Sequence, residues 1–299
     1  MAEQEKKRRG DRKDARLVRD CDSMHKFFPY MLPDRTKNEA VLNETVDLTA
    51  LEAYLAERSK ADPEFKYTFF HAICAALGKV LYLRPKMNRF YSGFRFYERN
   101  DISFSYIVKK RLADNAEETL AIVKLDKDSD LSPLAQFHDK TKKIVYSVRK
   151  EGKNDGATDD MGTLVKLPRP ILKVVVGFLR FLEYHGWYPS SLMKEDPYYS
   201  SVFVSNLGSI KMKAQYHHLA DWGTNSVFCV IGEKKLSPVF QPDGSYEMRM
   251  TLDIGFTIDE RIADGTYFAK SIRILRQLLT HPELLDRPLS EPVELDENV

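Results

Sequence analysis

Carboxylates and an arginine are gathered near the carboxyl end of the chain, in the run Asp259-Glu260-Arg261-Ile262-Ala263-Asp264-Gly265. Glu260 has the apolar neighbours Ile258 and Ile262, and burial among such side chains raises the pKa of a carboxylate toward the range of a general base. Arg261 acts in the other direction if it turns inward. The run therefore indicates a group at position 260 that is capable of proton transfer.

An imidazole is available from the adjacent pair His217 and His218, in the stretch "AQYHHLADWGTNS". We expect this pair on the strand that follows Ser205, where neighbouring side chains face opposite ways and at most one enters a site. A core or interface histidine is the alternative interpretation. The other histidines lack a supporting group and are interpreted as structural: His25, His71, His138, His185 and His281. No histidines lie at ligand spacing with a nearby carboxylate or cysteine, so we predict no metal site.

The composition is that of a globular protein, with 43% hydrophobic residues and a formal net charge of +2. The low net charge and the absence of zinc-finger or phosphate-loop patterns argue against a nucleic-acid partner. Cys21, Cys74 and Cys229 are odd in number and unevenly spread, which indicates reduced thiols and a cytoplasmic location. We find no signal peptide and no apolar stretch near the roughly 20 residues that a membrane span requires.

Predicted strands and helices alternate along the chain and position the candidate residues. A strand is expected to end at Val46, with Asp47 as the N-cap of a helix that carries Leu48, Leu51 and Leu55 on one face. Further helices are predicted over 65–84, 132–151, 168–188 and 266–280. Strands are predicted on both sides of a turn at 98–101, at 119–126, within 198–219, at 225–235 and at 247–259.

Two motifs in order along the chain carry a resemblance to a known family. "SSVFVSNLGSI", followed by "VFCVIGEKK" and "TLDIGFTIDERIADG", resembles the catalytic domain of the dihydrolipoyl acyltransferases of 2-oxo acid dehydrogenase complexes, and more remotely chloramphenicol acetyltransferase. The family signature is Asp-His-Arg-x-x-Asp-Gly, and this chain has Glu260 at the histidine position. The resemblance covers roughly residues 12–285, apart from about 40 residues before Tyr198.

The resemblance implies an α/β fold of the chloramphenicol acetyltransferase type, an α+β two-layer sandwich in which helices flank a mixed sheet. It divides the chain into a flexible charged leader (1–15), a catalytic domain (16–285) with a helical insertion at about 158–197, and an acidic tail (286–299). It also implies a homotrimer with active sites between subunits. Coenzyme A is the implied acyl carrier and co-substrate, and the other substrate is a small acyl compound.

The resemblance also assigns roles residue by residue. In the family, the signature histidine takes a proton from a thiol of coenzyme A or dihydrolipoamide. Ser205 of the neighbouring chain would donate to the oxyanion, because a hydroxyl aimed at developing negative charge stabilises a tetrahedral intermediate. Asp264 would pair with Arg16 or Arg19, or cap the helix that follows it. The remaining carried-over positions are Asn206, Gly208 and Gly265 for cofactor binding, with Asp259 and Arg261 as structural residues.

Glu260 departs from the family pattern. A thiol titrates near 8.5 and an ordinary glutamate near 4.3, so proton transfer is uphill by about 4 pKa units, or roughly 6 kcal/mol, against about 2 units for histidine. Two interpretations follow. The chain is an acyltransferase with an altered base, or it is a non-catalytic trimeric binding or assembly module that kept the fold.

The helix predicted over 168–188 is absent from the family. Its polar residues lie on one narrow stripe, and most of its circumference is apolar, so we expect it to be buried against something. Three roles are open: packing between subunits, walling a pocket for a long acyl chain, or lying in a membrane interface with Lys173 and Arg180 toward the headgroups.

Overall fold

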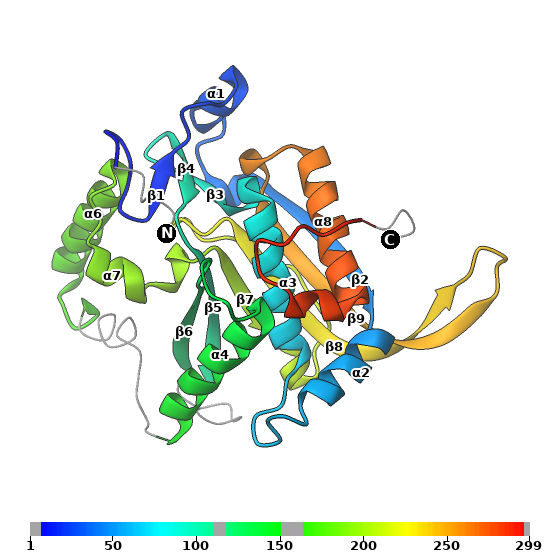
Figure 1. Ribbon diagram of the computed structural model, residues 1–299. Coiled ribbons are helices and arrows are strands. Elements are labelled where there is room, and N and C mark those ends of the chain that lie inside the picture. Colours follow the sequence, from blue (N-terminus) through cyan, green and yellow to red (C-terminus); the bar gives the residue numbers. More distant parts are fainter. Residues whose placement is uncertain (1–6, 110–117, 151–163, 296–299) are drawn as a thin grey trace.

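A mixed six-stranded sheet lies at the centre of the computed structural model, which describes residues 7–109, 118–150 and 164–295 (Figure 1). Its strand order is β2-β9-β8-β7-β5-β6, with β7 parallel to both β5 and β8 and the other pairs antiparallel. The strands are β2 (Glu39–Asp47), β5 (Ile102–Lys109), β6 (Glu118–Leu125), β7 (Val202–Asn206), β8 (Val227–Phe240) and β9 (Tyr246–Asp259). The expected mixed sheet is confirmed.

Helices cover one face of this sheet: α2 (Thr49–Arg58), α3 (Phe69–Leu83), α4 (Pro133–Lys150) and α8 (Gly265–Thr280) (Figure 1). Alternate residues of each strand face them, so Val227, Cys229 and Ile231 of β8 join the main core. The helix expected after Asp47 is present, but its N-cap is Leu48 and not Asp47, which accepts from the Thr49 N–H at 2.9 Å. The helix predicted over 65–84 begins only at Phe69, because Thr68 and His71 form a capping box there.

A second sheet, of order β1-β4-β3, lies beside the first and consists of β1 (Ala15–Leu17), β3 (Arg89–Ser92) and β4 (Arg95–Arg99). The two strands expected around residues 98–101 are therefore confirmed, but they belong to different sheets. Their separation is fixed by Arg99, which is buried and donates to the Tyr199 carbonyl and to Thr224 Oγ1.

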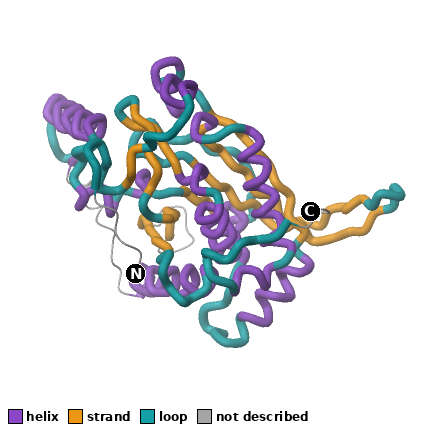
Figure 2. The backbone as a smooth tube through the Cα atoms, turned by 45° about the horizontal axis from the view of Figure 1, so that its top comes forward, coloured by secondary structure: helices purple, strands orange, loops and turns teal. Residues whose placement is uncertain are grey.

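Three further helices flank the second sheet: α1 (Ser23–Met31), α6 (Arg169–His185) and α7 (Ser190–Glu195) (Figures 1 and 2). The helix predicted over 168–188 corresponds to α6; α1 was not predicted. The start of the predicted insertion, 158–163, and parts of the predicted leader and tail lie outside the described residues. Within the predicted leader, Arg12 is buried and pairs with Glu183 of α6 at 2.9 Å.

The other face of the six-stranded sheet is covered in part by chain without regular structure. The long strand expected within 198–219 is wrong beyond Asn206, where the chain turns into the short 3-10 helix η4 (Leu207–Ile210) and then crosses the sheet. Two glycines make room for this crossing, because a Cβ at Gly232 would lie 2.4 Å from the Ala214 nitrogen and one at Gly255 would lie 2.5 Å from the Gln215 carbonyl oxygen.

Beyond the sheet, β8 and β9 continue as a two-stranded arm that projects from the body (Figures 1 and 2). The arm carries exposed apolar side chains, which are Leu236, Phe240, Tyr246 and Met248. Such side chains normally pack on a partner, because burying apolar surface stabilises by roughly 25 cal/mol per Å².

We predict that Gly208→Ala destabilises the fold by about 1–3 kcal/mol, because a Cβ there would lie 2.3 Å from the Gly232 carbonyl oxygen and the backbone must shift. Gly265→Ala is the matched control, since nothing lies within 4 Å of a Cβ at that position. Urea unfolding monitored by circular dichroism measures both. Equal stability of the two variants would contradict the packing argument.

Candidate functional site

The carboxylate-rich run forms the turn between β9 and α8. β9 ends at Asp259, the 3-10 helix η5 (Glu260–Ile262) follows, and Asp264 caps α8 by accepting from the Tyr267 N–H at 2.9 Å. This contact holds the pKa of Asp264 below its usual value. Asp259 and Arg261 are buried, whereas Glu260 and Asp264 are exposed. The turn therefore exposes Glu260 between two buried residues, Asp259 and Arg261.

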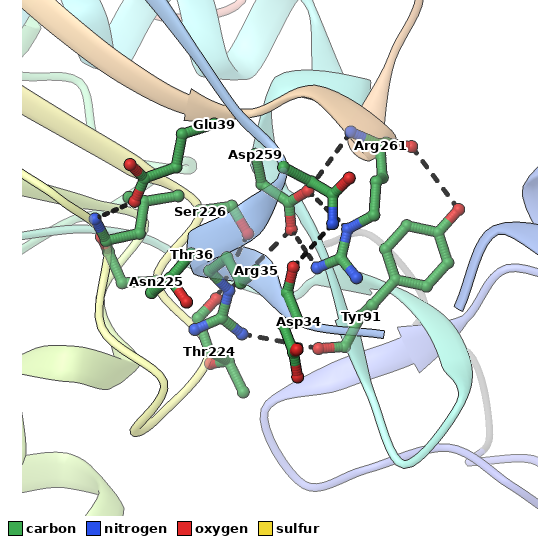
Figure 3. A network of polar contacts seen from close by, with 12 residues as sticks. Asp34, Arg35, Thr36, Glu39, Tyr91, Thr224, Asn225, Ser226, Asp259 and Arg261 are labelled. Atoms are coloured by element: carbon green, nitrogen blue, oxygen red, sulfur yellow. Dashed lines mark hydrogen bonds and ion pairs between the residues drawn. The ribbon is translucent and has the colours of Figure 1, made fainter. Parts of the chain in front are cut away.

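An ion pair between Asp259 and Arg261 holds this turn in place (Figure 3). Arg261 Nε and Nη2 each donate to one Asp259 oxygen at 2.7 Å, which is the bidentate geometry that arginine and carboxylate favour. The second guanidinium near this carboxylate belongs to Arg35, whose Nε lies 3.9 Å from Asp259 Oδ2. One buried carboxylate thus neutralises part of the charge of two buried arginines.

Arg35 extends this network to the loop that precedes β8 (Figure 3). Its guanidinium donates to the Ala220 carbonyl at 2.9 Å and to the Gly223 carbonyl at 3.2 Å. Burial lowers the pKa of Arg35, and the nearby Asp259 charge opposes that effect. One set of polar contacts therefore holds together three segments. They are the turn between β9 and α8, which we call the signature turn, the segment before β2 and the loop before β8.

A cavity of about 890 Å³ opens beside Glu260, between α8, the edge strand β2 and α1. Ile258, Leu42, Phe268 and Ile272 form apolar parts of its wall. Its charged lining includes Glu260, Asp264, Arg273 and Arg276. A cavity of this size, mostly apolar and with a few polar groups, is typical of a site for a small molecule.

His25 and Asp22 of the α1 region line the same cavity. His25 Nδ1 lies 2.8 Å from Asp22 Oδ2, and Asp22 Oδ1 accepts from the His25 backbone N–H at 2.9 Å. Both contacts hold the pKa of Asp22 below its usual value. Tyr91 fixes this segment to the signature turn, since its hydroxyl donates to the His25 carbonyl at 2.9 Å and lies 3.5 Å from the Arg261 carbonyl.

The interpretation of His25 as lacking a supporting group is therefore wrong. The sequence signal was "CDSMHKFF", in which an aspartate three residues before a histidine opens a short helix. That spacing lets one aspartate cap the helix and hold the imidazole.

Ser205 does not line this cavity. It lies on β7, half-buried, on the sheet face that carries Phe203 and Phe228, opposite the large helices. Asn206 caps η4 by accepting from the Ser209 N–H, and the backbone of Gly208 approaches Gly232. Within one chain, the predicted site residues thus fall into two separate places.

His217 and His218 are exposed and lie on the irregular crossing segment, so their predicted place on a strand is wrong. The ring of His217 stacks on Phe228 with centroids 4.2 Å apart, and neither histidine lines the cavity. Their Nδ1 atoms contact the carbonyls of His218 and Leu219, respectively. The expected alternative base is therefore not beside Glu260 in this chain.

The predicted partners of Asp264 are placed elsewhere. Arg19 pairs with Asp11 at 2.9 Å, and Arg16 lies opposite Glu98 in the β1–β4 ladder. Asp264 acts as the helix cap, which was the other expectation. Gly265 is the first residue of α8 and adjoins the cavity. Among the described residues, no group of acidic, histidine or cysteine side chains is arranged to hold a metal ion.

No family model and no curated protein matches the sequence. The fold, however, is shared with solved structures. The cubic core of the pyruvate dehydrogenase multienzyme complex is 13% identical, with a TM-score of 0.58 over 87% of each chain. Chloramphenicol acetyltransferase is 12% identical, with a TM-score of 0.52 over 89% of this chain and 99% of the other.

A third similar structure is the dihydrolipoamide acetyltransferase of Azotobacter vinelandii, which is 12% identical with a TM-score of 0.57 over 87% of each chain. That protein was studied for the roles of a serine, a histidine and an asparagine in its catalytic mechanism. This chain has the fold of acyltransferase catalytic cores and chloramphenicol acetyltransferase, as the resemblance predicted.

We predict that Asp259→Asn destabilises the protein by about 3–5 kcal/mol, because it leaves two buried arginines without their counter-ion. Asp253→Asn is the control on the same strand. Its partner, Lys235, is partly exposed, so the expected loss is about 0–1 kcal/mol. Chemical denaturation at neutral pH measures the difference, and equal losses would show that the buried network is not essential for stability.

Proposed function

We propose that this chain, with the fold of the acyltransferase cores, is a coenzyme A-dependent acyltransferase whose sites are completed between subunits of a homotrimer. The observation that supports this most directly is the signature turn. It holds Glu260 at a cavity that also contains a histidine and its aspartate, while Ser205 lies on a different face. A site made from two chains accounts for this separation.

The cavity suits coenzyme A as a substrate. Its apolar wall, which includes Phe268 and Ile272, matches the largely uncharged pantetheine arm. Arg273 and Arg276 line the cavity, and arginine is well suited to phosphate recognition; Arg276 pairs with Glu44 at 2.8 Å, so a phosphate would compete with that carboxylate. The second substrate, which exchanges the acyl group with coenzyme A, is a small molecule.

His25 is the proposed base in place of the missing signature histidine. Asp22 contacts Nδ1, which fixes that nitrogen as the N–H and leaves Nε2 to accept a proton, as in a histidine–aspartate pair. An imidazole is in general a stronger base toward a thiol than a carboxylate is. The pair from α1 is therefore the better proton acceptor at this cavity.

The proposed reaction joins the two half-sites. Nε2 of His25 takes the proton of the coenzyme A thiol, and the thiolate attacks the acyl carbonyl. The hydroxyl of Ser205 from a neighbouring subunit donates to the oxyanion. Collapse of the intermediate breaks the bond to the leaving group, which takes the proton back from His25. The reverse direction uses the same groups.

Two features support the trimer. The projecting arm exposes Leu236 and Phe240 at 60% and 70%, and no other segment among the described residues covers them. The face around Ser205 exposes Ile107 on the neighbouring strand β5. Burial of these surfaces on other copies would stabilise an assembly.

A non-catalytic trimeric binding module is the second candidate. The exposed carboxylate of Glu260 at the signature position favours it, because an exposed glutamate is a poor base for a thiol. An intact trimer that binds coenzyme A but catalyses no transfer, with His25 in place, would support this alternative.

We predict that His25→Gln lowers acyl transfer from acetyl-CoA to dihydrolipoamide by about 10²–10⁴-fold, the usual contribution of a general base. Glutamine at this position can still form the helix cap, so the fold should be retained. His281→Gln, at the far end of α8 and outside the cavity lining, is the control and should leave the rate unchanged. Full activity of His25→Gln would exclude it as the base.

We predict that co-expression of His25→Gln with Ser205→Ala restores activity that neither variant has alone. In each mixed trimer about one of the three shared sites would combine an intact histidine from one chain with an intact serine from the next, which is about a quarter of all sites when the chains assemble at random. Sedimentation velocity would verify the trimer in the same samples. Mixed trimers as inactive as their parents would show that the two residues do not act in one shared site.

A further inference from the structure

The helix α6 lies on the outside of the molecule. None of its residues is fully buried, so whatever covers its apolar face is not supplied by the described part of this chain. None of its residues lines the cavity beside Glu260, which gives no support to a role as the wall of an acyl-chain pocket. Any role of α6 therefore involves its exposed surface.

One side of α6 is anchored firmly to the body. Glu183 pairs with Arg12 at 2.9 Å, accepts from Ser92 Oγ at 2.9 Å and accepts from the Tyr199 hydroxyl at 2.8 Å. At Gly93 the backbone approaches so closely that a Cβ would lie 2.0 Å from the Tyr184 carbonyl oxygen. The helix is thus held in a fixed orientation, with its opposite side outward.

The outward side is apolar. Ile171, Val174, Phe178 and Phe181 follow the spacing of one helix face, and their exposed fractions are 51%, 72%, 59% and 50%. Exposed rings continue this surface beyond the helix: Trp187 stacks on His185, Phe94 contacts Tyr184, and Tyr30 of α1 contacts Phe94 at 5.1 Å. We call this continuous surface the aromatic belt. A single exposed apolar side chain is ordinary on a protein surface, but a connected set of this extent marks a binding surface.

Basic residues flank the belt. Arg169, Lys173 and Arg180 of α6 are exposed and lie four and seven residues apart, so they share one side of the helix, and the exposed Lys166 precedes the helix. None of them forms an ion pair within the described part of the chain. The one acidic residue of α6, Glu183, faces the body and is paired there. The exposed part of α6 therefore combines an apolar face with a purely cationic flank.

We propose that α6 and the aromatic belt dock the protein on an anionic lipid bilayer. A helix with Phe and Trp on one face and Lys and Arg beside it lies in the plane of the interface, with its apolar side chains among the acyl chains. Tyrosine and tryptophan favour the headgroup level, which suits Tyr184 and Trp187 at the end of α6. No helix in the described ranges has the length and hydropathy to cross a bilayer, so the helix lies along the surface.

The charge of the flank favours a lipid surface over a second copy of the chain. Two copies meeting through α6 would bring the same cations together, and like charges at an interface oppose association. Anionic headgroups instead supply the complementary charge for every cation of the flank. The proposal does not depend on acyl transfer, because it concerns a surface away from the cavity.

Vesicle flotation of the full chain tests the proposal. The protein should float with vesicles of equal parts phosphatidylcholine and phosphatidylglycerol, and binding should fall at high salt and with pure phosphatidylcholine. Lys173→Glu with Arg180→Glu should weaken binding by at least about fivefold for each cation removed. Lys213→Glu with Lys270→Glu makes the same change in net charge on exposed residues elsewhere and should leave binding nearly unchanged.

The apolar face is tested by Phe178→Ser, with the exposed Leu131→Ser as its control. Phe178→Ser should weaken flotation, and the control should not. In a Trp222→Phe background Trp187 is the remaining tryptophan, and its emission should shift to the blue on anionic vesicles. A protein that does not float, or that binds neutral vesicles equally well, would overturn the proposal. So would a Phe178→Ser variant that floats normally but sediments as a smaller assembly, because the face would then join copies of the chain.

Discussion

The buried ion pair of Asp259 with Arg261, with Arg35 as a second cation, is the constraint on which the rest of the site depends. Taking these charges out of water is costly, and the cost is offset only when each group is paired and hydrogen-bonded. The bidentate contact and the carbonyls of Leu32, Pro33, Ala220 and Gly223 supply those partners. Three segments distant in the sequence are therefore held together, and Glu260 is turned toward the cavity.

This scaffold is separate from the chemistry. Asp259 and Arg261 are inaccessible, so they can persist whatever residue lies between them. The proposed base comes instead from α1, which Tyr91 connects to the same turn. Under the proposed function, the site lacks the histidine of the family signature but keeps the Asp259–Arg261 pair. Its imidazole comes from His25 of α1 instead.

Much of the fold could be predicted from local patterns. Asp264 before α8 predicted a helix start that the structure confirms, and Asp47 predicted the start of α2 to within one residue. The segment after η4, which crosses the sheet, was predicted as a strand because its sequence resembles one. The glycines that leave room for it belong to β8 and β9. Such long-range packing leaves no signal in the segment itself.

The candidate site was predicted only in part, for a similar reason. The frame around Glu260 was recognisable from its motif, but the cavity and its histidine–aspartate pair require α1, a short helix that contains Pro29 and was not predicted. The apolar circumference of α6 predicted burial, whereas the structure places that surface outside. Sequence periodicity shows that a face is apolar, but it does not show what covers the face.

Cross-linking across the proposed shared site tests the central claim most directly. The variant would carry Ser205→Cys and Glu260→Cys with Cys21→Ser. The native thiols of Cys74 and Cys229 are buried, and burial raises their pKa, so they should react slowly. A short bis-maleimide should join cysteine 205 of one chain to cysteine 260 of another, giving covalent dimers and trimers on a denaturing gel that neither single-cysteine variant gives. Monomers alone, or a link confined to one chain, would contradict a site shared between copies.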